Sequence, residues 1–228
     1  MLERGLIFSF LLAVSLIFAP LAASPPVSKS VKSAVAPYLL PEDHVIRPLL
    51  EKIFTRSRVI LNLETLEKAG FEQVMPRKFT SLIVTKHPQV PGYIFKIYLD
   101  AQRYHKNTPE HEYWIMRIQG AERVRNFIQS NGWEMSFKVP HKWIYELPKT
   151  PKPSSDYQTK YYILVEEDMN LLSSSDNKKA WGSDQVTHEL LDQFYRILKK
   201  IGLADCAKTM HLFRLMVALL SLIPKHLA

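Results

Sequence analysis

The clearest pattern along the chain is an alternation of apolar and polar positions from Tyr93 to Asp100. The odd-numbered positions are all apolar or aromatic, whereas the even-numbered positions bring Lys96 and an aspartate to the opposite side. Successive side chains of a β-strand point to opposite faces, so this alternation predicts a strand with one face in a core. A lysine between apolar neighbours on a strand must reach water, pair with a carboxylate or hold an anionic ligand.

Helical spacing precedes this strand. Apolar residues recur at helical intervals over residues 45–53, facing inward, and Pro41 is placed to open that helix. A second, short helix is predicted over residues 63–68, where Asn62 is the cap and Gly70 the stop.

Two β-rich stretches, residues 71–75 and 79–85, lead into the lysine strand. Three antiparallel strands in succession are the most economical arrangement. A long helix is then predicted from Thr108 to about Asn131. Its predicted inward seam consists of Tyr113, Met116, Gly120, Val124, Phe127 and Ile128. The glycine in this seam would allow close approach to the layer beneath.

A fourth strand is predicted over residues 143–147 and a fifth over 161–165, which is apolar throughout and therefore typical of a central strand. An acidic stretch and a serine-rich loop follow, and a helix is predicted over residues 183–201 with its cap at Ser183. The predicted fold is therefore α+β: an antiparallel sheet of about five strands with a long packed helix, followed by a further helical segment.

The N-terminus has the pattern of a secretory signal. A short charged start precedes an apolar run over residues 6–18, and small residues follow up to a cleavage position near Ala23. We expect residues 1–23 to be removed on export and residues 24–40 to be a flexible leader. The alternative is an uncleaved anchor, although the apolar run is shorter than the roughly 20 residues of a spanning helix.

Charge and composition limit the binding partners, disulfides and metal sites that can be expected for this protein. The formal charge is +8, but the basic residues are scattered, so they indicate solvated surfaces and no nucleic-acid partner is expected. The single cysteine, Cys206, excludes an intramolecular disulfide and a cysteine-based metal site, and no disulfide-linked oligomer is expected. The histidines show no metal-ligand spacing, so no metal site is predicted.

The order of elements is three strands with a lysine in the third, a long helix, two strands, an acidic hinge and another helix. It resembles the small lobe and first large-lobe helix of the protein-kinase-like fold, especially atypical kinase-like proteins of bacteria, over about residues 71–206. The resemblance implies that Lys96 holds the α- and β-phosphates of ATP and that Glu112 or Glu122 orients it. It also implies that Asp205 accepts the proton of a substrate hydroxyl.

The same resemblance implies that the backbone around Val165, Glu166 and Glu167 meets the adenine ring. One departure concerns the first hairpin, over residues 72–81, which has none of the glycines that cover the phosphates in kinases. A catalytic kinase would bind ATP and magnesium. The absence of these glycines favours a protein that uses the same scaffold to bind a different partner.

The last residues of the sequence also differ from the pattern of kinase-like proteins. In kinase-like proteins an asparagine follows the catalytic aspartate after four residues and a second aspartate binds magnesium, but residues 209–228 form a nearly acid-free tail without either ligand. Another reading frame after Ala207 permits an asparagine five positions after Asp205. We therefore expect residues 209–228 to be a frameshifted tail on a truncated protein. The alternative is a genuine helix over residues 212–223, too short to span a membrane.

These observations predict an exported kinase-like protein that is catalytically incomplete. Its parts would be a small lobe at residues 41–168, including the N-terminal helices, and the start of a helical lobe at residues 169–208. The alternative is a non-catalytic secreted or membrane-associated effector of α+β fold, which uses its surface to engage a protein partner. Weak membrane association would follow from the tail and the positive charge.

Overall fold

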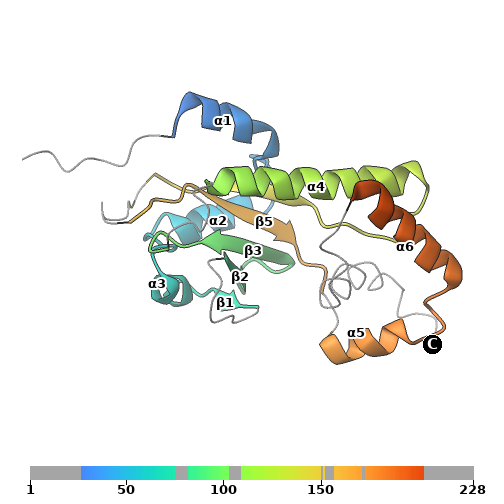
Figure 1. Ribbon diagram of the computed structural model, residues 1–228. Coiled ribbons are helices and arrows are strands. Elements are labelled where there is room, and N and C mark those ends of the chain that lie inside the picture. The colour runs from blue at the N-terminus through green and yellow to red at the C-terminus, as the bar shows by residue number, and fades with distance from the viewer. Residues whose placement is uncertain are drawn as a thin grey trace, which may run out of the picture.

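The structure is a computed structural model that describes residues 27–74, 82–102, 109–149, 151, 157–170 and 173–202 (Figure 1). The predicted signal segment at residues 1–23, most of the first hairpin's turn and the predicted tail at residues 209–228 lie outside these residues.

Five strands form one antiparallel sheet in the order β1-β2-β3-β5-β4. Each of the five predicted strands is present, and the α+β fold class is confirmed. The strands are β1 (Glu72–Gln73), β2 (Leu82–Lys86), β3 (Tyr93–Tyr98), β4 (Lys142–Glu146) and β5 (Tyr162–Glu167). The apolar β5 is central, as predicted, because it pairs with both β3 and β4.

Helices cover both faces of this sheet. They are α1 (Lys29–Val35), the 3-10 turn η1 (Ala36–Tyr38), α2 (Arg47–Phe54), α3 (Leu63–Lys68), α4 (Glu110–Ser130), α5 (Ser174–Trp181) and α6 (His188–Ile201). In Figure 1 α4 lies along one face of the sheet with α1 beside it, while α2 and α3 lie on the other side. The cap of α3 is the predicted one, since the Asn62 side chain accepts from the Thr65 N–H.

The alternation in β3 divides the two cores as predicted. Phe95, Ile97 and Leu99 belong to the larger core with α2 and α3. Tyr98 points the other way and packs with Trp114 of α4 in a second core, their rings stacked 5.1 Å apart. Lys96 lies on this second face, beneath α4, because it shares the register of Tyr98.

The predicted seam of α4 was only partly right. Trp114, Ile118 and Ala121 are buried, whereas Met116 is 53% exposed. The helix has two apolar stripes because its two halves meet different neighbours: the first half packs on the sheet, and the second packs with α6 in a third core. Nothing lies within 4 Å of a Cβ built on Gly120, so no close approach requires this glycine.

The flexible leader predicted for residues 24–40 was wrong over its described part, residues 27–40. Ser28 caps α1, and Val35 and Leu40 are almost fully buried. The Leu40 N–H donates to the Ile144 carbonyl at 2.8 Å, so this segment covers the outer edge of β4. We call residues 27–40 the N-terminal strap.

Two helix starts also differ from prediction. The helix expected from Pro41 begins at Arg47, after turns, and leaves Val45 80% exposed. The helix expected from Ser183 begins at His188, with Thr187 as its cap. Part of the predicted serine-rich loop is α5, which the hydroxyl of Ser173 caps by accepting from the Asp176 N–H. Near the predicted start of both α2 and α6, a second proline or hydroxyl residue offered another possible start for the helix.

Candidate functional site

Strand register brings three charged side chains together on the face beneath α4. Glu166 of β5 stands directly across from Lys142 of β4 and across from Ile94 of β3, so Lys96 is its diagonal neighbour. Diagonal neighbours on one sheet face are within reach of long side chains. Lys96, Glu166 and Lys142 form what we call the lysine–glutamate cluster.

One carboxylate oxygen in this cluster holds two ammonium groups. Glu166 Oε2 lies 2.6 Å from Lys96 Nζ and 3.1 Å from Lys142 Nζ. The three side chains are only 12–17% exposed. Since a single carboxylate faces two ammonium groups, the cluster carries an excess positive charge in a poorly solvated place.

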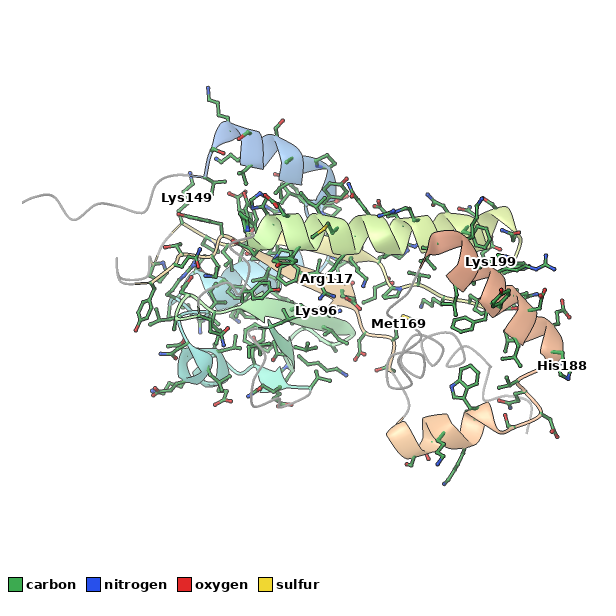
Figure 2. The ribbon with its side chains drawn as sticks, in the orientation of Figure 1. Lys96, Arg117, Lys149, Met169, His188 and Lys199 are labelled. Atoms are coloured by element: carbon green, nitrogen blue, oxygen red, sulfur yellow. The ribbon has the colours of Figure 1, made fainter. Side chains whose placement is uncertain are left out.

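The electrostatics of the cluster follow from this imbalance. Burial alone would raise the pKa of the Glu166 carboxyl, but Lys142 and Lys96 together outweigh burial and hold that pKa below its ordinary value of 4.5. Burial lowers the pKa of the Lys142 ammonium, the nearby charges of Lys96 and Arg117 act in the same direction, and Glu166 offsets them only partly. Figure 2 labels Arg117 on α4 near Lys96.

The expected partner of Lys96 was wrong. The ion pair of Lys96 is made with Glu166, and neither Glu112 nor Glu122 is within ion-pair distance of it. Glu112 is exposed, and Glu122 lies further along α4, in the lining of a cleft beside Lys142. The sequence pattern identified the face on which Lys96 lies but not the strand that would supply its carboxylate.

The predicted hinge is engaged within the protein. Val165 is fully buried in the larger core, on the face away from Lys96. The Glu167 N–H donates to the His141 carbonyl at 3.0 Å, and the His141 N–H donates to the Glu167 carboxylate at 2.8 Å. The Asp168 N–H donates to the Gly92 carbonyl at 2.8 Å. The backbone N–H groups of Glu167 and Asp168, near which adenine was expected, are therefore already hydrogen-bonded within the protein.

Asp205, the expected catalytic residue, lies outside the described residues. The same holds for residues 75–81, which belong to the predicted first hairpin, the element that covers the phosphates in kinases. The structure thus brings together Lys96 and Glu166 among the residues predicted for the site, and sets Glu112 and Val165 apart from them.

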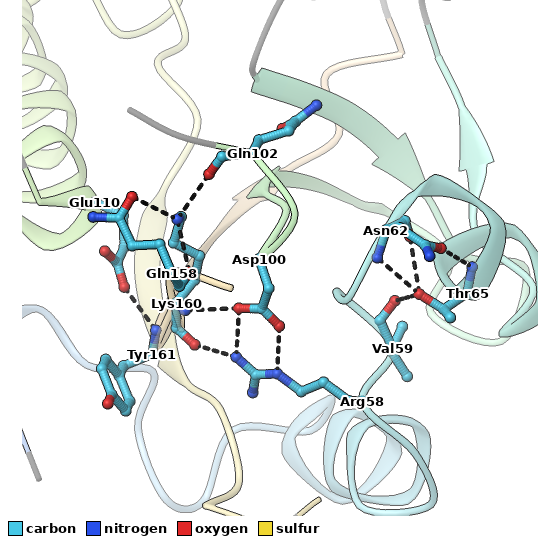
Figure 3. A network of polar contacts seen from close by, with 10 residues as sticks. All are labelled: Arg58, Val59, Asn62, Thr65, Asp100, Gln102, Glu110, Gln158, Lys160 and Tyr161. Carbon is cyan, nitrogen blue, oxygen red and sulfur yellow. Dashed lines mark hydrogen bonds and ion pairs between the residues drawn. The ribbon is translucent and has the colours of Figure 1, made fainter. Parts of the chain in front are cut away.

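Sequence reasoning missed a second polar cluster (Figure 3). The Arg58 guanidinium donates two hydrogen bonds, of 2.7 and 2.9 Å, to the buried carboxylate of Asp100. The Lys160 N–H donates to the same carboxylate at 2.7 Å, and the Lys160 ammonium donates to the carbonyls of Gln158 and Gln102. The second acid of this cluster is Glu110, whose carboxylate accepts from the Tyr161 N–H at 2.7 Å and acts on Lys160 together with Asp100. Two acids and two cations therefore balance and are bound by backbone groups, which is typical of a structural network. The only signal in the sequence was an aspartate at the end of an apolar strand.

Two further kinds of feature are absent from the described residues. No three His, Cys, Asp or Glu side chains there gather closely enough to hold a metal ion. Likewise, the described helices include none with the length and apolar character needed to cross a membrane.

Comparison with known proteins found no matching family model, no matching curated protein and no matching solved structure. The kinase-like interpretation therefore stays a prediction that depends on the element order and on the position of Lys96.

Proposed function

We propose that this chain is an exported, kinase-like protein that acts by binding and does not transfer phosphate. The observation that carries the proposal is the ion pair between Lys96 and Glu166 at 2.6 Å. The lysine that would hold phosphates has an internal partner on the neighbouring strand, and that partner also holds Lys142.

The element order supports the kinase-like part of the proposal. Three strands, the long helix α4, two strands and a later long helix follow one another as the resemblance implies. Lys96 lies in the third strand and faces α4, and the end of β5 runs beside the start of β3. This is the general placement needed for a lysine and a hinge to share one ligand.

The contacts of the site support the non-catalytic part. Phosphoryl transfer needs a lysine that is oriented by a helix glutamate and metal ligands that hold magnesium. Here the carboxylate comes from β5, and the N–H groups of Glu167 and Asp168 bond to carbonyls of the chain. In the sequence no asparagine follows Asp205 at the required spacing.

Mg-ATP is the ligand that tests this proposal. A ligand that binds only the native state raises its melting temperature. We expect millimolar Mg-ATP to leave the melting temperature of the purified chain unchanged. Stabilisation that saturates with Mg-ATP in the unaltered chain and disappears in Lys96→Met would overturn the non-catalytic proposal and restore the phosphate-holding role of Lys96.

Export and truncation are proposed from the sequence and have their own tests. Mass spectrometry of the chain recovered from the medium and from the membranes of the producing cells should show a new N-terminus near Ala23 in the medium; an intact Met1 found in the membranes alone would favour the anchor. Sequencing of the gene should reveal an open frame that continues past Ala207 with an asparagine; a downstream region without such a frame would refute truncation.

A further inference from the structure

A cleft lies between α4, the start of β4 and the end of the N-terminal strap. Its lining comes from three separate parts of the chain: Pro37, Tyr38, Leu39 and Pro41; Ile118, Ala121, Glu122 and Arg125; His141, Lys142 and Trp143. Its volume is about 200 Å³, which leaves room for a small anion and is below the size of a site for drug-sized ligands. It lies at the β4 edge, away from the first hairpin.

The charge of this cleft is unbalanced. Arg125, Lys142 and His141 line it together with a single acid, Glu122. The carboxylate of Glu166 is shared between Lys142 and Lys96, so it compensates only one of the two ammonium groups. Among the described side chains, Glu122 forms no ion pair with Arg125 or Lys142. The cleft therefore has positive charge without a matching carboxylate.

Arg125 also has an unused donor. Its Nη2 donates to the Pro140 carbonyl at 3.0 Å, which fixes the guanidinium against the start of the β4 segment. Its Nε is buried and has no hydrogen-bond partner among the described residues. A buried donor without a partner is unfavourable. The Nη atoms of the same guanidinium have N–H groups besides the one bonded to Pro140, and these can donate to an anion in the cleft.

The rest of the lining is mixed. The buried Ile118 and Ala121 and the rings of Tyr38 and Trp143 contribute to a lining that is mainly polar. The Tyr38 hydroxyl accepts from the Gln119 amide at 2.7 Å, and the Trp143 ring stacks with His141 at 5.9 Å. The walls are thus held in place before any ligand arrives.

We propose that this cleft binds a small organic anion, with a phosphate or carboxylate group at Arg125 and Lys142 and a small remainder, such as a single ring, against Tyr38 or Trp143. This inference names a ligand class for the binding function proposed above and rests on it. Lys96 does not line the cleft, so the two proposals can be tested apart.

Phenyl phosphate is a suitable probe, with benzoate, inorganic phosphate and phenol as comparisons. Calorimetric titration of the purified chain should show saturable binding of phenyl phosphate or benzoate, weaker binding of inorganic phosphate, and none of phenol. Whether phenyl phosphate or benzoate binds more tightly identifies the anionic group. Arg125→Gln should weaken binding by about tenfold, because it removes a charge-assisted bond.

Arg123→Gln is the matched control, since it makes the same charge change two positions away on the same helix, where the side chain is exposed. It should leave affinity within about twofold, and Lys142→Gln should match Arg125→Gln. No binding of either aromatic anion, or equal losses in Arg123→Gln and Arg125→Gln, would overturn the inference. Binding of Mg-ATP that requires Lys96 would instead overturn the non-catalytic proposal and leave this result standing.

Discussion

Lys96 shows how strand register, more than local sequence, decides the partner of a buried charge. Its alternating neighbours place it on the face beneath α4, as the sequence predicted. Its partner Glu166 comes from β5, about 70 residues later, and the helix acids Glu112 and Glu122 do not pair with it. A period-two pattern defines the two faces of a strand, but the pairing of distant strands is set by tertiary packing. The partner could therefore not be read from the sequence.

The pH dependence of stability tests the charge of Glu166. Its folded pKa is below the ordinary value of 4.5, so its contribution is present above that pH and is lost as the pH falls through the folded pKa. Glu166→Gln should cost about 3 kcal/mol at neutral pH, because it leaves two buried ammonium groups without a counter-charge. Urea unfolding across an acidic pH series should show this difference shrinking.

The exposed Glu112 provides the control for that series. Glu112→Gln should change the unfolding free energy by no more than about 0.5 kcal/mol at any pH. A loss for Glu166→Gln that stays constant into strong acid would mean that the glutamate is not charged in the folded protein.

At the scale of elements, the predictions were correct where a short stretch of sequence determines the structure. The strands β2, β3 and β5 and the capped helix α3 were predicted because β-rich composition, alternation, a continuous apolar run and the Asn62 cap are all local signals. The long helix α4 was located correctly, but its buried face was predicted only in part, because the sheet and α6 cover different stripes of it. Helical periodicity assumes a single neighbouring layer.

Two glycines test this description of α4. Gly120 lies in the helix, and a Cβ at this position would meet only open space, so Gly120→Ala should stabilise the protein by about 0.5–1 kcal/mol through helix propensity. Gly92 also has open space, but its φ is +83°, and Gly92→Ala should destabilise by about 1 kcal/mol. Chemical denaturation of both variants gives the values. A clear loss in Gly120→Ala would mean that α4 packs more closely there than described.

At the scale of the whole molecule, the N-terminal strap joins three parts of the fold. Its proline- and serine-rich composition predicted flexibility, but a few apolar residues, including Val35 and Leu40, are buried against the sheet and α4. Burial of isolated apolar residues depends on partners elsewhere in the chain, so composition could not predict it. The strap also forms one wall of the proposed anion cleft.

A pair of truncations to alanine tests the docked strap. Leu40→Ala should lower the free energy of unfolding by about 2–4 kcal/mol, because it opens a cavity in the larger core. Val45→Ala should have an effect below about 0.5 kcal/mol, since Val45 is 80% exposed. Urea denaturation of both variants decides the matter. Equal, small effects would mean that residues up to Leu40 are a free leader after all.

The internal pairing of Lys96, on which the non-catalytic proposal depends, can be measured by a double-mutant cycle between Lys96→Met and Glu166→Gln. Lys96→Met and Glu112→Gln form a parallel cycle. If Lys96 is held by the strand carboxylate, the first cycle should give a coupling free energy of about 1–3 kcal/mol in chemical denaturation and the second a value near zero. Coupling to Glu112 without coupling to Glu166 would refute this pairing and return Lys96 to the arrangement of an active kinase.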